Sequence, residues 1–175
     1  MMKLRTMAGG IAAAAVMTFS GFAYAAAQPG DFSTLPVDPN LITDSLAYNA
    51  APPVLNPNGQ PGIETVYTHR DGSRTITTTV LVLPDAGAAT AALNGAAAGL
   101  VANGNSQPAA VGSDGTMLTG MSPDGSKSVT VLSFAEGNTA TTIEFAGAAK
   151  DPVPSDLVLE LGRKQDTAIR DWQAS

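Results

Sequence analysis

Alternating apolar and polar residues predict two β-strands over residues 63–69 and 74–83, which are rich in Thr, Val, Ile and Tyr. The turn signal Asp71-Gly72 lies between them, so we expect a β-hairpin. A turn centred on these two residues pairs Tyr67 with Ile76. The side chains expected on the core face of the hairpin are Ile63, Thr65, Tyr67, Ile76, Thr78, Val80 and Val82.

Three further strands are predicted over residues 116–121, 128–135 and 139–145, and turn residues separate them. In the middle one, apolar side chains point to both faces, which is typical of a central strand that is covered on both sides. The third alternates cleanly, with Thr142 and Glu144 expected to face solvent.

Helical spacing of apolar residues predicts two helices. The first is expected to run from its N-cap Asp85 to about residue 102, where the Asn103-Gly104 pair can end it. The second is expected over residues 156–173 with Ser155 as its N-cap. The side chains expected on the buried face of the second helix are Val158, Leu161, Gln165, Ala168, Ile169 and Trp172.

Seven prolines between Gln28 and Gly62 predict a mostly extended lead-in over residues 26–61. Within it, Asp38 can cap a short helix whose expected apolar contacts are Leu41, Ile42 and Leu46. The order β-β-α-β-β-β-α then indicates an α+β fold with an antiparallel sheet of about five strands. We expect residues 62–175 to form this single domain, with two helices packed on one face of the sheet.

The N-terminus is typical of an export signal, because Lys3 and Arg5 precede an apolar run over residues 8–22. Ala23 and Ala25 supply the small residues that signal peptidase requires. We therefore expect residues 1–25 to be a cleavable signal for the general secretory pathway, cut after Ala25 or alternatively after Ala27. An uncleaved N-terminal anchor is the other interpretation. After cleavage, the chain is expected in the cell envelope or the medium, with no membrane span.

Composition narrows the range of functions. The full chain carries 9 basic and 15 acidic residues, and loss of Lys3 and Arg5 with the signal leaves 7 against 15, a net charge of −8. Such a chain repels phosphate backbones, so we expect no nucleic acid among its partners. With no cysteine, the sequence excludes disulfides, thiolate metal sites and a lipid anchor on Cys, and we expect a freely soluble monomer.

Little in the sequence supports catalysis. His69 is the single histidine, so a secreted hydrolase would have to use it with a nearby Ser and Asp. No Gly-x-Ser-x-Gly elbow, dinucleotide fingerprint, phosphate loop or calcium-binding loop is present, and we expect no cofactor and no metal. We therefore expect a protein that is not an enzyme, and the hydrolase stays as an alternative.

Aromatic residues are sparse, which singles out Tyr48, Tyr67 and Trp172 as a candidate binding face. They are expected around an apolar pocket between the terminal helix and the sheet. The alternative is that Tyr67 and Trp172 complete the hydrophobic core, as residues at core-facing spacings commonly do.

The order of elements over residues 40–173, with an Ala-rich helix after the first hairpin and a terminal helix reaching Trp172, resembles the PsbP-like domains of mycobacterial cell-envelope lipoproteins. It is more distantly similar to the extracellular sensor domains of PknH-type kinases. The resemblance implies an exported, non-catalytic module that binds a small apolar molecule or another envelope protein. A secreted structural or antigenic protein without a ligand is a further alternative. The chain departs from those relatives because it lacks their acylated or disulfide-bonded cysteines.

Overall fold

The computed structural model describes residues 31–43 and 46–175, so the expected signal segment with Ala23 and Ala25 lies outside the described residues. The helical elements are the 3-10 turns η1 (Phe32–Thr34), η2 (Pro39–Leu41) and η3 (Pro57–Gly59) and the helices α1 (Ala86–Leu93) and α2 (Ser155–Ala174). The strands are β1 (Tyr48–Ala50), β2 (Val54–Leu55), β3 (Gly62–His69), β4 (Thr75–Val82), β5 (Ala102–Pro108), β6 (Ser113–Met121), β7 (Lys127–Glu136) and β8 (Thr139–Ala148). No helix in the described part of the chain is long and apolar enough to cross a membrane.

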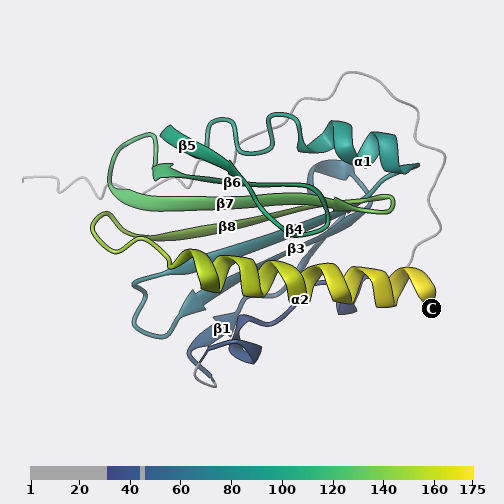
Figure 1. The fold of residues 1–175 in the computed structure, drawn as a ribbon. Helices are drawn as coiled ribbons and strands as arrows, with labels where there is room; N and C mark the ends of the chain where they lie inside the picture. Colours follow the sequence, from purple (N-terminus) through teal and green to yellow (C-terminus); the bar gives the residue numbers. More distant parts are fainter. Residues whose placement is uncertain (1–30, 44–45) are drawn as a thin grey trace, which may run out of the picture.

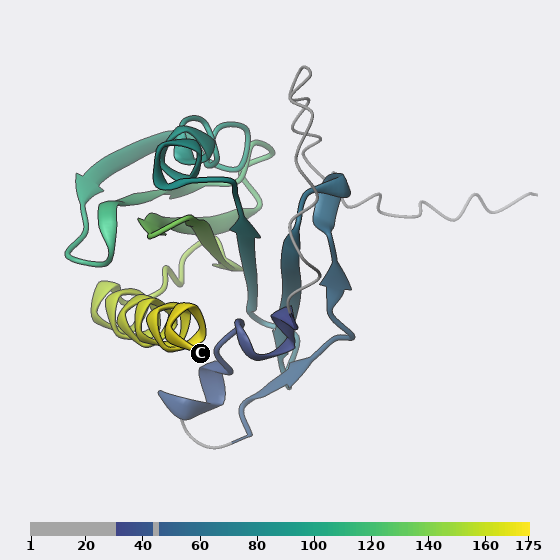
Figure 2. The same cartoon turned by 90° about the vertical axis from the view of Figure 1, so that its right-hand side faces the viewer.

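The described strands form one antiparallel sheet, which confirms the α+β fold class. Their order is β1-β3-β4-β8-β7-β6-β5, and β2 also pairs with β3. The sheet has eight strands rather than about five, because β1, β2 and β5 carry no alternating apolar pattern that would have indicated them. The sheet is bent, and α2 lies in the angle between its two halves (Figure 1, Figure 2).

The hairpin of β3 and β4 has the predicted register. Tyr67 lies opposite Ile76, and the N–H of His69 donates to the carbonyl of Arg74 over 2.8 Å. Gly72 takes a positive φ of 73° in the turn, a conformation that a glycine adopts without steric cost. The predicted core face of this hairpin is buried along its whole length.

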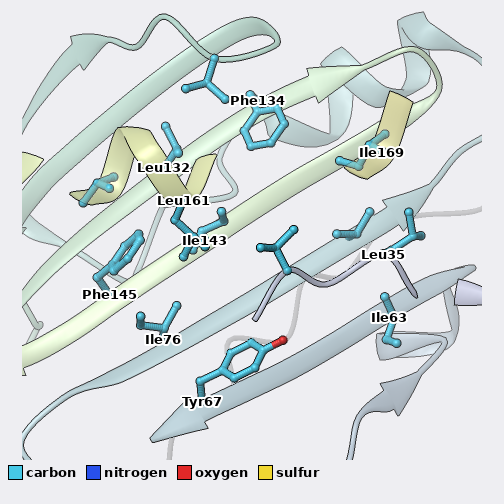
Figure 3. Close-up of a cluster of buried hydrophobic side chains, with 14 of the residues drawn as sticks. Leu35, Ile63, Tyr67, Ile76, Leu132, Phe134, Ile143, Phe145, Leu161 and Ile169 are labelled. Atoms are coloured by element: carbon cyan, nitrogen blue, oxygen red, sulfur yellow. The ribbon is translucent and has the colours of Figure 1, made fainter. Parts of the chain in front are cut away.

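The main hydrophobic core fills the space between α2 and the concave face of the sheet (Figure 3). Leu161 and Ile169 of α2 are fully buried against side chains such as Leu132 and Ile143, and each such burial contributes about 1.5–3 kcal/mol. Ala168 and Trp172 are partly buried at the edge of this face. The helix begins at Ser155, so Pro154 and not Ser155 is its N-cap.

The first described segment, residues 31–43, packs into this core and is called the strap below. Leu35 of the strap is fully buried beside the sheet, and Figure 2 shows the strap between α2 and β1, β3 and β4. Gln165 of α2 holds it through its side-chain amide, which accepts from the N–H of Val37 over 2.9 Å and donates to the carbonyl of Leu35 over 2.6 Å. The lead-in therefore completes the same core as residues 62–175.

The short helix predicted after Asp38 is present as the 3-10 turn η2, and the Asp38 carboxylate accepts from the N–H of Asn40 over 2.9 Å. Its predicted apolar contacts are partly wrong. Ile42 packs against the core, but Leu41 and Leu46 are exposed, because a single turn cannot direct all three side chains inward.

The two helices lie on opposite faces of the sheet, so the expectation that both pack on one face is wrong (Figure 1). Ala89 of α1 packs against Leu83, Ala135 and Ala140, whose side chains point away from α2. Because β7 carries apolar side chains on both faces, each face needs its own cover. The two-sided pattern that predicted a central strand therefore also required helices on both sides.

The helix α1 ends at Leu93, well before the predicted end near residue 102. Asp85 caps it as expected, with its carboxylate accepting from the N–H of Ala88 over 2.8 Å. Gly95 and Gly99 take positive φ values of 82° and 85°, so the chain continues as turns. Each glycine lowers helix stability by about 1 kcal/mol relative to Ala. The segment after α1 therefore packs over β7 as turns and not as a continued helix.

Candidate functional site

Tyr67, one of the three candidate binding residues, belongs to the core. It is 4% exposed and faces the same cluster as Leu35 and Ile63 (Figure 3). Burial raises the pKa of Tyr67 to about 12, and the Asp38 carboxylate adds to the shift. A side chain so enclosed stabilises the fold and offers little surface to a ligand.

Trp172, the second candidate, joins α2 to the strap. Its ring lies 6.0 Å from that of Phe32 between centroids, at an interplanar angle of 53°, and its indole N–H donates to the carbonyl of Asp31 over 3.3 Å. The cleft between the terminal helix and the sheet, where an apolar pocket was expected, is filled by the strap's own Leu35 and Phe32. Tyr67 and Trp172 line neither of the two hollows beside the strap.

The larger hollow, of about 520 Å³, runs along α2 next to the strap. Val37, Leu41 and Ala168 give it an apolar surface. Charged side chains of both signs surround this surface: Glu160, Arg163, Lys164 and Asp171. Mixed charge of this kind selects no simple anion or cation.

The smaller hollow, of about 320 Å³, contains Tyr48, the third candidate. Pairing of β1 with β3 places Tyr48 opposite His69, and their rings meet edge to face at 5.2 Å between centroids. Arg74 and Asp151 complete the hollow with an ion pair of 2.7 Å. Burial raises the pKa of Tyr48, and the Arg74 guanidinium opposes that shift.

The acidic turn residue beside this hollow orients the histidine. Asp71 Oδ1 lies 2.6 Å from Nδ1 of His69 and accepts the N–H of Ser73 over 2.8 Å. Hydrogen bonds from Ser73, and then from His69, lower the pKa of the Asp71 carboxyl. Ser73 reaches the carboxylate through its backbone N–H, and no hydrogen bond within the described residues joins its hydroxyl to the His69 ring, as a nucleophile would need.

A different surface stands out on the outer edge of the sheet. Residues 50–55, Ala-Ala-Pro-Pro-Val-Leu, are all exposed although none is polar, and we call them the apolar strip. Val54 is 52% exposed and Leu55 is 59% exposed. The chain carries no charged residue from 45 to 63, so the strip lies in an uncharged stretch of a strongly acidic protein.

Hydrogen bonds to β3 hold the apolar strip in an extended conformation. The N–H of Ala51 donates to the carbonyl of Val66 over 2.8 Å, and that of Asn56 donates to Gly62 over 2.9 Å. Between these two bonds, β2 pairs with the start of β3. Pro52 and Pro53 have no N–H to offer, so this edge is a poor template for an added strand and presents side chains instead.

The described residues contain no group of three or more His, Asp or Glu side chains that could hold a metal ion. Two neighbouring carboxylates, those of Glu136 and Asp166, both contact Arg170. Their charge is thus met by a guanidinium of the chain itself.

Comparison with known proteins gives one informative likeness. The sequence matches no family model and no curated protein. Its fold is similar to that of the extracellular domain of PknH from Mycobacterium tuberculosis. The two share 12% sequence identity with a TM-score of 0.52, and the match covers 79% of this chain and 95% of the PknH domain. At this identity the likeness to the PknH domain shows the fold alone, and the resemblance to PsbP-like lipoproteins stays a prediction.

The sequence reasoning missed the apolar strip, although a signal for it was available. Residues 45–61 lie in the lead-in that the prolines predict. Six consecutive apolar residues flanked by polar Asn on both sides are unusual in a segment that is not itself buried. The pocket of Tyr48 was missed for another reason, since it depends on the pairing of β1 with β3.

Proposed function

We propose that this protein is a non-enzymatic binding domain that acts outside the cytoplasm and contacts a partner protein through the apolar strip. The export-type N-terminus and the fold that it shares with an extracellular domain support the location. The exposed aliphatic side chains support the mode of binding.

The single observation that carries the proposal is the exposure of Val54 and Leu55 within an uncharged stretch. Full burial of such a side chain contributes about 1.5–3 kcal/mol, and these two are already close to half buried. A partner that covers the remaining surface of both would gain about 2 kcal/mol, which is roughly a 30-fold gain in affinity.

The apolar strip is suited to a protein partner for two further reasons. Its hydrogen bonds to β3 and its two prolines fix the backbone, so binding costs little conformational entropy. It also lies at the outer edge of the sheet (Figure 2), whereas small molecules bind in concave pockets. A partner with an apolar groove would fit an extended, proline-containing segment of this kind.

Native mass spectrometry of the protein purified gently from its producing cells tests the proposal. We expect a retained protein subunit on the wild type and its loss from the double variant Val54→Ser, Leu55→Ser. The matched control is Leu41→Ser, which removes a still more exposed leucine beside α2 and should keep the subunit.

Three results would contradict the proposal. The first is a wild-type protein that is always a bare monomer, and the second is a retained small apolar molecule in place of a subunit. The third is loss of the subunit in Leu41→Ser but not in the double variant, which would assign binding to the hollow beside α2.

A further inference from the structure

The hollow around Tyr48 carries chemistry that the proposed protein partner does not use. It lies where β1, the turn between β3 and β4, and the start of α2 meet. Its polar groups come from distant parts of the sequence: Thr43, Tyr48, His69, Ser73, Arg74 and Asp151. Ala47 and Leu157 add a small apolar surface.

The side chains of this hollow are held in place before any ligand arrives. Asn40 clamps the backbone of Tyr48, accepting from its N–H over 2.9 Å and donating to its carbonyl over 3.0 Å. His69 is fixed between Asp71 and the ring of Tyr48. Arg74, whose side chain is 18% exposed, is fixed by Asp151. Pre-organised polar groups bind a ligand with little loss of side-chain entropy.

The charges of the hollow nearly cancel. Within its lining the Arg74 guanidinium is paired with Asp151, and the Asp71 carboxylate, which does not line the hollow, contacts Nδ1 of the His69 ring. There is no excess positive charge that would attract a phosphate or a carboxylate, and Arg74 opposes a cation.

The unused hydrogen-bonding groups include both donors and acceptors. Nδ1 of His69 is engaged by Asp71, so Nε2 is the ring nitrogen left for a ligand, and it accepts a hydrogen bond in the tautomer that carries its proton on Nδ1. No hydrogen bond within residues 31–43 and 46–175 engages this nitrogen or Oδ1 of Asp151. The guanidinium of Arg74 has further N–H donors, and the Tyr48 hydroxyl can both donate and accept.

We propose that this hollow binds a neutral polyhydroxylated molecule of the size of one sugar ring. Each hydroxyl of such a ligand donates and accepts, so it can pair with the mixed set around Tyr48, His69 and Arg74. A volume of about 320 Å³ is at the small end of ligand pockets, which favours a single ring over a longer chain. The small apolar surface of Ala47 and Leu157 fits the C–H face of a sugar.

The single histidine makes the test direct, because its imidazole gives one set of NMR signals that arises inside the hollow. The purified protein is titrated with glucose, galactose, mannose, arabinose and N-acetylglucosamine, with glycerol as an open-chain polyol and with acetate and phosphate as anions. We expect a saturable shift of the His69 signals with at least one of the neutral sugars. The comparison of sugars with glycerol then shows whether a ring is required.

Two variants tie the response to the hollow. Asp151→Asn removes a hydrogen-bond acceptor at a well-exposed position, so it should weaken the sugar response about fivefold or more. It also leaves the charge of Arg74 without its partner carboxylate, so it should create a response to acetate. Arg163→Gln, which lies beside the other hollow, is the control and should change neither response. Far-UV circular dichroism verifies that both variants are folded.

Absence of a saturable shift with every sugar would overturn the proposal, even if glycerol gave one, because the hollow would then not bind a molecule of ring size. A wild-type response to acetate or phosphate alone would overturn it too, because the hollow would then be an anion site. A sugar response that Asp151→Asn leaves unchanged would place the binding elsewhere. None of these outcomes depends on the apolar strip, so the two proposals fail separately.

Discussion

Replacement of Gln165 by Met tests how the strap is held. Gln165 is 1% exposed, and its amide binds two backbone groups of the strap, the N–H of Val37 and the carbonyl of Leu35. Met fills a similar volume but cannot form either bond. Each buried backbone group that is left without a partner costs about 1–3 kcal/mol, so we expect the free energy of unfolding to fall by about 2–4 kcal/mol. The expected loss lies toward the low end of the summed cost of the two groups, because water can form hydrogen bonds with part of a loosened strap.

Urea unfolding followed by the fluorescence of Trp172, the single tryptophan, measures this loss. Hydrogen exchange at the Val37 amide adds a local readout, since its protection should fall more than that of amides in β7. Lys164→Met, an exposed neighbour on the same helix, is the control and should change stability by less than about 0.5 kcal/mol. Equal stability and unchanged Val37 exchange in Gln165→Met would refute the clamp.

Three further predictions concern the packing of the helices. Gly162→Ala should lower the free energy of unfolding by about 1 kcal/mol although Ala favours helix, because the new Cβ would collide with Cδ2 of the fully buried Leu132. Chemical denaturation that shows a gain in stability would contradict this. Burial raises the pKa of Asp166 in the folded state. The folded protein therefore favours the protonated carboxyl, and this contribution to stability is present at low pH and is lost as pH rises through the folded-state pKa. The melting temperature of Asp166→Asn minus that of the wild type should therefore increase from about pH 3 to about pH 7. A decrease in this difference over the same range would contradict the prediction. Asp85→Ala removes the cap on the N–H of Ala88 and should cost about 1 kcal/mol in denaturant unfolding, whereas no change would show that α1 does not depend on its cap.

The sequence correctly predicted those elements in which the pattern of apolar residues matches the burial that the fold gives them. The β3–β4 hairpin follows from alternating residues around Asp71 and Gly72, and its register is as expected. The helix α2 follows from a clear apolar stripe, and Gln165 was placed correctly on its buried face. The partner of Gln165 could not be predicted, because the strap reaches it from far away in the sequence.

The sequence missed, or gave wrong bounds to, the elements that depend on contacts with distant parts of the chain. The polar strand β5 has no apolar alternation and forms because β6 offers an unpaired edge. The end of α1 is set by Gly95 and by packing over β7, which outweigh the helical spacing of the alanines. The exposure of Val54 and Leu55 follows from their place at the sheet edge, which a proline-rich sequence alone does not reveal.

Site-specific photo-crosslinking in the producing cells tests the central claim, that the apolar strip contacts a partner protein, most directly. A photoreactive residue at Val54 should give a discrete crosslinked protein, whereas the same residue at Gln107, exposed on the opposite edge strand β5, should give none. The crosslink at Val54 should also become weaker when Leu55→Ser is introduced. No crosslinked protein at Val54, or the same one at Gln107, would contradict the claim.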